Sequence, residues 1–428
     1  MKKTILVLIV LFASFCPALA IEMTLSPRVR VSEEYTDNLF LTPDNTTDDF
    51  ITTTGVGASL GFRMPTAGLT LAYDPEYATY QDNSYLNSWR HFASMDGYWQ
   101  MTRQTRLGVT DTFTISDDPA DDTQTDIQAR GRNRFTRNTA HAEIANQFGR
   151  ADSVELGYNH TMLKNKLATV EDSQSHNPYM DFLWWFVENE YGFQAHADYR
   201  RGLFEFSDDF NSWSGDFRLR KRFTRHFDMF LQYAQMITKY DHDPNAIDAA
   251  TVENYEVYNP GAGFNYIAGE NTNISIAAGY ALRHREFSGN DEGPVITSDL
   301  RTAWIYRRGL IEFTASSGYT QDTFSTDNRG FNVFGEAGGR GEYGFTNRLR
   351  GDVAARYRYV RYLDEDPVGE DQFLSAGPGL AYQALSWMRF RLDYTYRTVF
   401  SNIPADEYTE NRAMLSLVLE PATPYRWN

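Results

Sequence analysis

Arginine recurs at every second position in several segments of this 428-residue chain, and its spacing carries the clearest chemical signal. Arg supplies 34 of the 40 basic residues, because the sequence contains only six Lys. The guanidinium group binds carboxylates and phosphates through a planar fork that the Lys ammonium lacks. Rows of Arg on one face of a structure would therefore suit the recognition of anions.

The Arg rows lie in segments with a period of two, most clearly over residues 348–359, 388–397 and 213–222. One set of alternating positions is apolar or aromatic, and the other is mostly Arg and Asp. Successive side chains of a β-strand point to opposite faces, so each segment is predicted to be a strand with one apolar and one charged face. If the apolar faces contact lipid, ten Arg face an aqueous interior. These candidates are Arg218, Arg220, Arg301, Arg348, Arg350, Arg356, Arg358, Arg389, Arg391 and Arg397.

Two interpretations of these Arg remain open. Rings of basic side chains favour the passage of anions, so the Arg could contact a substrate directly. Alternatively, they could pair with acidic neighbours and make the wall rigid. The faces that carry the Arg also carry Asp216, Asp352 and Asp393, so we expect some of the Arg to pair with these carboxylates.

Other residue patterns give weaker signals. The acidic run from Asp117 to Asp122 does not have the spacing of an EF-hand, and we interpret it as a solvated loop. Asp241-His242-Asp243 lies in another predicted loop. The eight His are scattered singly, and no nucleophile motif, phosphate loop or dinucleotide fingerprint occurs. We therefore expect no catalytic residues, no metal site and no cofactor.

About twenty segments with strand-like patterns follow one another along the chain, each long enough for a tilted membrane strand. They are residues 25–35, 50–62, 68–80, 88–101, 106–115, 134–148, 153–163, 176–186, 191–203, 212–223, 227–240, 255–266, 272–282, 295–306, 310–320, 331–343, 348–360, 371–382, 387–399 and 407–419. Short links alternate with longer polar links such as 37–49, 116–133, 241–254 and 283–294. This alternation is typical of outer-membrane barrels, which have short periplasmic turns and long outer loops.

Composition supports a barrel and excludes other classes. The formal charge of −17 argues against a general nucleic-acid binder. The aromatic content of 15% is too high for a disordered chain, and Tyr and Trp gather near predicted strand ends, as in the interfacial belts of membrane barrels. No linker or low-complexity segment marks a domain boundary.

The N-terminus reads as a secretory signal peptide over residues 1–20, with Lys2 and Lys3, a short apolar run and Ala18-Leu19-Ala20. We expect cleavage after Ala20, which would remove Cys16, the single Cys of the chain. The remaining residues, 21–428, are predicted to form one barrel domain.

Residues 31–62 resemble the opening of an outer-membrane β-barrel porin family found near bacterial exopolysaccharide loci. A Glu-x-Tyr-x-Asp-Asn-hydrophobic-aromatic string from Glu33 to Phe40 carries the resemblance, which as a motif covers only the first strand and loop. The resemblance implies a role in polysaccharide export or related transport across the outer membrane. It transfers no functional residue to this chain.

The C-terminus departs from the common barrel pattern. Pro421 and Pro424 interrupt the alternation after residue 419, and the chain does not end in Phe. We hypothesise that Tyr425 and Trp427 serve as the aromatic signal for the barrel-assembly machinery.

These observations predict an all-β fold, a transmembrane antiparallel up-and-down barrel of about 18–20 strands in the bacterial outer membrane, with both ends in the periplasm. The expected function is a porin-like channel that acts as a passive conduit in the export of an exopolysaccharide, with an anionic polymer favoured. A general solute porin and a structural or adhesive surface barrel remain open as alternatives. Expected partners are outer-membrane lipid, the barrel-assembly machinery, polysaccharide and periplasmic export components, without nucleic acid.

Overall fold

The structure, a computed structural model, describes residues 21–119, 132–188, 190–241, 253–322, 330–364 and 368–427. The predicted signal peptide, residues 1–20 with Cys16, lies outside the described residues. Within them, no helix combines the length and the apolar character that crossing a bilayer requires.

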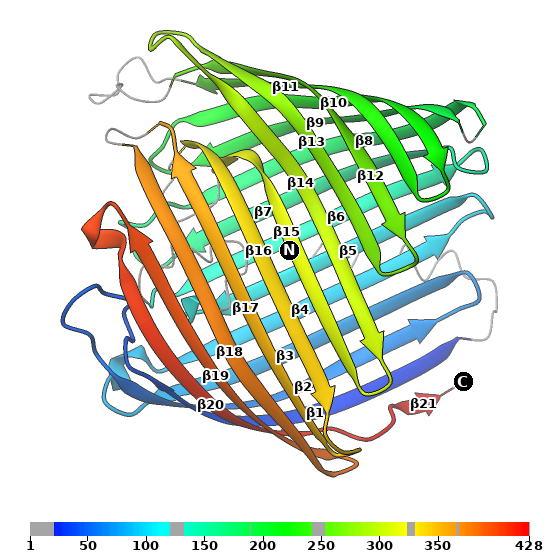
Figure 1. The fold of residues 1–428 in the computed structure, drawn as a ribbon. Helices are drawn as coiled ribbons and strands as arrows, with labels where there is room; N and C mark the ends of the chain where they lie inside the picture. Colours follow the sequence, from blue (N-terminus) through cyan, green and yellow to red (C-terminus); the bar gives the residue numbers. More distant parts are fainter. Residues whose placement is uncertain are drawn as a thin grey trace.

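Twenty long strands and one short terminal strand make up the described fold (Figure 1). The strands are β1 (Glu22–Thr36), β2 (Asp49–Arg63), β3 (Ala67–Tyr80), β4 (Ser88–Gln100), β5 (Thr105–Ser116), β6 (Phe135–Gln147), β7 (Ser153–Asn165), β8 (Ser173–Val187), β9 (Tyr191–Phe204), β10 (Asp209–Thr224), β11 (Phe227–Asp241), β12 (Tyr255–Ala268), β13 (Thr272–Arg285), β14 (Asn290–Tyr306), β15 (Gly309–Asp322), β16 (Gly330–Gly344), β17 (Leu349–Tyr362), β18 (Gly369–Leu385), β19 (Met388–Ser401), β20 (Tyr408–Leu419) and β21 (Tyr425–Trp427). Two 3₁₀ turns, η1 (Ser84–Leu86) and η3 (Pro404–Asp406), lie in loops.

Each of the long strands pairs antiparallel with the next, and the last pairs with the first. β20 contacts β1 from Thr36↔Arg412 to Val29↔Leu419, and β21 continues along β1 to Met23↔Trp427. The sheet is therefore a closed barrel, which leaves no free edge at the point of closure. The predicted fold class is confirmed, and the strand number lies at the upper end of the predicted range.

Alternation along the strands separates an outer apolar face from an inner polar face. Val56 and Leu231 on the outer face are each 66% exposed, and Val353 is 55% exposed. Asp228 of β11 and Arg350 and Asp352 of β17 lie on the other face, where they form ion pairs. Lipid-exposed apolar residues and a polar interior are the arrangement of an outer-membrane barrel.

The two ends of the barrel differ in their connections, as predicted. Two residues join β14 to β15 at one end, whereas residues 37–48 join β1 to β2 at the other. The segment 283–294 is an exception, because its prediction as a long loop was wrong. The β13–β14 ladder continues to His284↔Asn290, and Gly289 takes a φ of 88° in the tight turn between them. Polar residues outside the bilayer can extend a hairpin as well as form a loop.

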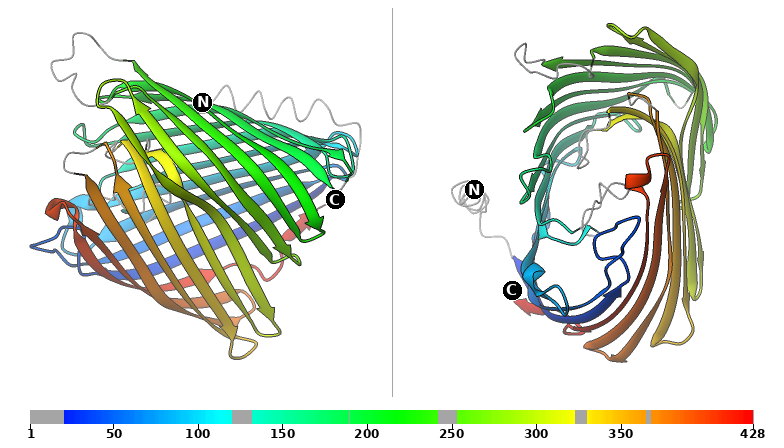
Figure 2. Two further views of the ribbon diagram at one scale, coloured as in Figure 1. Left: turned by 45° about the horizontal axis from the view of Figure 1, so that its top comes forward. Right: turned by 90° about the vertical axis from the view of Figure 1, so that its left-hand side faces the viewer.

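Part of the buried core lies inside the long-loop end of the barrel. Leu41, from the loop after β1, packs with Phe373, Val399 and Tyr408 on the inner faces of β18, β19 and β20. Figure 2 (right) shows this loop lying within the ring of strands when the long-loop end faces the viewer. Through this packing the loop narrows the mouth of the barrel.

Candidate functional site

The inner face of the barrel carries the Arg rows, and acidic partners occupy most of them. Eight of the ten candidate Arg form ion pairs with carboxylates of the same face. The pairs join Arg218 to Asp216, Arg220 to Asp228, Arg301 to Glu312, Arg350 to Glu342, Arg356 and Arg358 to Glu336, Arg391 to Asp352 and Asp393, and Arg397 to Glu410.

The two remaining candidates differ in position. Arg389 lies in β19 and Arg348 lies in the turn before β17. Among the residues that the structure describes, neither side chain forms an ion pair. The row of Arg predicted over residues 348–359 therefore begins one residue before β17, and Arg348 lies at the short-turn end of the barrel.

Some ion pairs reach across an intervening strand, and a glycine makes room for them. Arg391 in β19 contacts Asp352 in β17 at 3.0 Å, although β18 lies between these strands. A Cβ at Gly379 of β18 would stand 2.6 Å from Nη2 of Arg391. A glycine at this position of β18 therefore allows the side chains to meet above the backbone.

A buried network of charged groups lies at the long-loop end. Asp117 and Asp118 follow β5, and their side chains turn into the barrel, where these residues are 5% and 2% exposed. Arg90 of β4 contacts Asp117 at 2.7 Å. Arg412 of β20 contacts Asp118 at 2.6 Å. The loop after β5 is thus fixed to β4 and, beyond β1, to β20.

Two further groups complete this network, which we call the mouth network. Arg132 contacts Glu34 of β1 at 3.1 Å. Tyr80 of β3 donates a hydrogen bond to Asp117 and accepts hydrogen bonds from Arg90 and Arg132 at 3.0 and 3.1 Å. The mouth network consists of Glu34, Tyr80, Arg90, Asp117, Asp118, Arg132 and Arg412.

The electrostatics of the mouth network favour its charged form. Burial raises the pKa of the Asp118 carboxyl, but Arg412 and the neighbouring Arg outweigh that effect, so the pKa falls well below its usual value. The pKa of Asp117 is also lowered, because Arg90 offsets the opposing effect of burial. Both aspartates are therefore ionised at neutral pH and hold the loop in place.

The interpretation of Asp117 and Asp118 as part of a solvated loop was wrong. Both residues are buried and paired, because Arg from β4, β20 and the end of the same loop converge on them. Asp121 and Asp122 lie outside the described residues. So do His242 and Asp243, whereas Asp241 pairs with Arg201 at 2.5 Å.

The string that carries the family resemblance anchors the first loop. Asp37 accepts hydrogen bonds from the backbone and side-chain amides of Asn411, both at 2.7 Å. The Asn38 side chain, 1% exposed, donates to the carbonyls of Thr42 and Thr409 at 2.8 and 2.9 Å. These contacts fasten the loop to β20 beside the closure of the barrel.

The wall has a seam between β14 and β15 towards the long-loop end. Their ladder stops at Ser298↔Ser317, although β14 continues back to Asn290 and β15 continues on to Asp322. Figure 1 shows the two strands diverging above this point. A polar cavity of about 360 Å³ lies there, lined by Asp198 and Ser214 on one side and by Thr297 and Tyr319 on the other.

Side-chain packing closes the seam beyond this cavity. Phe331 of β16 is buried with Tyr255 and Val257 of β12, and Arg283 of β13 lies over the rings of both Tyr255 and Phe331 at 4.6 Å. Arg283 also pairs with Asp364. Here the barrel is held by a small core and a buried charge instead of by backbone hydrogen bonds.

Tyr425 and Trp427, the candidate assembly signals, lie in β21 and are 55% and 49% exposed. β21 pairs with the first residues of β1, and Arg426 contacts Glu22 at 3.6 Å. The aromatic rings are thus accessible at the short-turn end. Their role as a signal stays a prediction.

The described residues contain no group of three or more His, Cys, Asp or Glu side chains arranged to hold a metal ion. Acidic residues of the inner face such as Glu336, Asp352 and Glu410 are instead placed against Arg.

Comparisons with known proteins agree with a porin barrel. Residues 190–421 match the family model described as Putative beta-barrel porin 2. No curated protein matches the sequence.

The chain is similar in structure to several solved outer-membrane proteins. The outer membrane protein opdK from Pseudomonas aeruginosa has 11% identity and a TM-score of 0.39, covering 92% of this chain and 99% of its own. A BenF-like porin from Pseudomonas fluorescens Pf-5 has 12% identity and a TM-score of 0.41, covering 92% and 98%. The siderophore receptor PirA from P. aeruginosa has 9% identity and a TM-score of 0.49, covering 95% and 81%. None of these TM-scores reaches 0.5.

Proposed function

The chain belongs to the Putative beta-barrel porin 2 family, and on that premise we propose that its lumen is a passive conduit in the export of an exopolysaccharide. Family membership itself makes the chain a porin-like channel of the bacterial outer membrane and not an enzyme. We propose in addition that the transported molecule is a polysaccharide and that it is anionic.

The exposure of the lumen Arg is the observation that carries the proposal. The side chains of Arg301 and Arg350 are 70% and 69% exposed, although both are paired with carboxylates. Exposed ion pairs contribute only about 0–1 kcal/mol. A carboxylate or phosphate group of a passing polymer can therefore replace Glu312 or Glu342 as the partner at little cost. Many such weak contacts would guide a polymer without holding it.

A general solute porin is the second candidate, and the local pairing of lumen charges favours it. An Arg such as Arg356, which contacts Glu336 at 2.8 Å, adds little net positive charge to the lumen. A neutralised wall would pass small solutes of either sign. The adhesive alternative loses support, because Asp117 and Asp118 are buried in the mouth network and do not form an acidic surface.

Deletion of the gene in its native host separates the two functions. The export proposal predicts that surface polysaccharide is lost while uptake of small solutes is unchanged, and that the wild-type gene restores the polysaccharide. Normal surface polysaccharide with slower uptake of small solutes would contradict the export proposal and support the general porin.

A further inference from the structure

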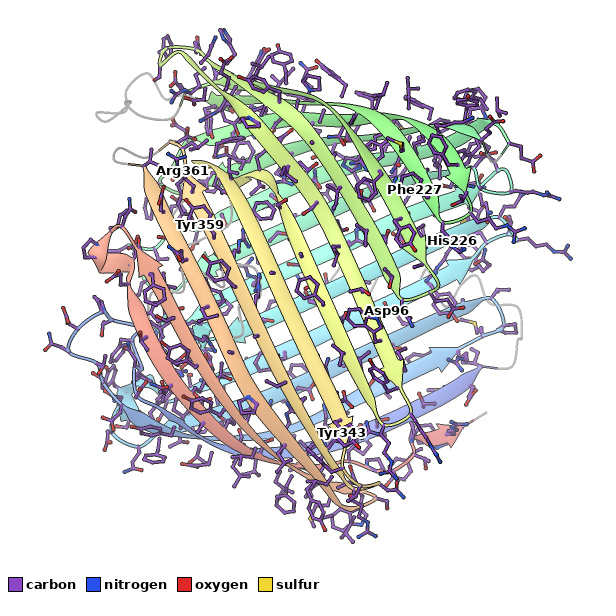
Figure 3. All side chains as sticks on the ribbon, in the orientation of Figure 1. Asp96, His226, Phe227, Tyr343, Tyr359 and Arg361 are labelled. Atoms are coloured by element: carbon purple, nitrogen blue, oxygen red, sulfur yellow. The ribbon has the colours of Figure 1, made fainter. Side chains whose placement is uncertain are left out.

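An apolar groove runs across the outer, lipid-facing wall near the short-turn end. It has a volume of about 800 Å³, within the range of about 300–1,000 Å³ typical of ligand sites. Ile311, Tyr343, Val353 and Leu392, from four strands between β15 and β19, line it. Figure 3 labels Tyr343 close to the turns at the lower end of this wall.

Gly341 adds depth to the groove, whereas the ring of Phe345 covers Gly351 at 2.8 Å from the position of a Cβ. Gly341 of β16 and Gly351 of β17 lie on the outer face among residues that are half exposed, such as Tyr343 at 50% and Val353 at 55%. A Cβ at Gly341 would meet only Val353, at 3.6 Å. The wall is therefore hollowed where neighbouring strands carry large side chains.

Three Arg lie in the two short turns that border the groove, and we call these turns its rim. Arg307 and Arg308 are the two residues between Tyr306 and Gly309, which both line the groove, and Arg348 precedes β17. All three are exposed. Within the described part of the chain, their guanidinium groups have no ion-pair partner.

The acidic residues beside the groove do not neutralise this rim. Glu342 and Asp352 contribute to the lining, but their carboxylates belong to the inner face. Glu342 contacts Arg340 and Arg350, each at 3.4 Å, and Asp352 contacts Arg391 at 3.0 Å. The rim therefore presents uncompensated positive charge to the membrane surface.

We propose that this groove and its rim bind one anionic phospholipid, with an acyl chain in the groove and the phosphate on the guanidinium groups. The groove lies at membrane level, so its natural occupant is a lipid chain. Arg binds phosphate through its planar fork, and basic clusters at a membrane surface attract anionic headgroups. This site is on the lipid side of the wall and does not depend on what passes through the lumen.

Native mass spectrometry of the full-length detergent-solubilised barrel tests the site, with phosphatidylglycerol and phosphatidylethanolamine of matched acyl chains as probes. We expect the barrel to retain one phosphatidylglycerol in preference to phosphatidylethanolamine. The triple variant Arg307→Gln, Arg308→Gln, Arg348→Gln should retain at least about tenfold less phosphatidylglycerol than wild type. Arg103→Gln, in another short turn, is the matched control and should behave as wild type.

A second pair of variants tests the groove separately from the charge. Gly341→Leu fills the groove and should abolish retention. Gly335→Leu lies on the same strand and face, where a Cβ has open space, and should leave retention unchanged. Heat-modifiable migration in gels verifies that each variant is folded. Equal retention of the two lipids by wild type, or equal retention of phosphatidylglycerol by a test variant and its control, would overturn the proposal.

Discussion

Arg412 donates a hydrogen bond through Nη2 to the Asp118 carboxylate at 2.6 Å, and the two residues are 294 positions apart in the sequence. The contact fixes the loop after β5 to β20, across the inner faces of the first four strands. At the long-loop mouth of the barrel, buried charges therefore hold a loop inward.

Removing Arg412 should destabilise the barrel and open the mouth. Arg412→Gln removes one of the two Arg that contact both Asp118 and Glu34, the other being Arg132. Breaking a buried pair costs about 3–5 kcal/mol. We expect a lower urea midpoint of unfolding in micelles and a larger single-channel conductance. Arg150→Gln is the control, because the Arg150–Glu188 pair is 88% and 67% exposed and should contribute less than about 1 kcal/mol. Equal changes in the urea midpoint and conductance for Arg412→Gln and Arg150→Gln would contradict the role of the mouth network in holding the loop.

Acidic pH should also open the mouth, but only at low values. The folded pKa values of Asp117 and Asp118 lie below the ordinary value of about 3.9. Their stabilisation is therefore fully present above that value and is lost as the pH falls through the folded pKa values. Single-channel conductance should stay constant from pH 8 to about 4 and rise below it. A rise centred near pH 6 would show that another group controls the mouth.

The seam depends on Arg283, which is 3% exposed. Arg283→Met removes the partner of Asp364 and the cation over Tyr255 and Phe331, so about 3 kcal/mol or more of stability should be lost. Limited proteolysis should then cut β14 or β15 faster than in wild type. Arg340→Met, at an Arg whose side chain is 55% exposed, is the control and should change neither stability nor cleavage. Equal cleavage of both variants would mean that the seam is closed by other contacts.

Asn38 should be a sensitive position of the string from Glu33 to Phe40. Asn38→Ala removes the buried side-chain amide that donates to the carbonyls of Thr42 and Thr409, which should cost about 1–3 kcal/mol. The urea midpoint measures this loss. Thr52→Ala on the outer face removes the hydrogen bond to Glu33 and should cost less. A midpoint for Asn38→Ala as high as for Thr52→Ala would contradict the anchoring role.

The strands could be predicted because alternation is a local property. Residues 348–359 and 388–397 show their two faces directly, and β17 and β19 were found within two residues of their predicted starts and ends. The sorting of loop lengths then predicted a barrel with two different ends. Both signals arise from lipid on one face and water on the other.

The mouth network could not be predicted, because its residues lie far apart in the sequence. Asp117 and Asp118 have the composition of a solvated loop, and only the closed barrel brings Arg412 to them. The seam also escaped prediction, since β14 and β15 keep their alternation beyond Ser298 and Ser317, where their pairing stops. Partner choice between strands is not a local property.

The reversal potential across a salt gradient in planar bilayers tests most directly whether the lumen is a conduit guided by Arg. Wild-type protein should give a potential that favours anions. The variant Arg301→Gln, Arg350→Gln, Arg389→Gln, Arg391→Gln should shift it towards cations, because their acidic partners remain. A cation-selective wild type whose reversal potential is unchanged in this variant would contradict the account.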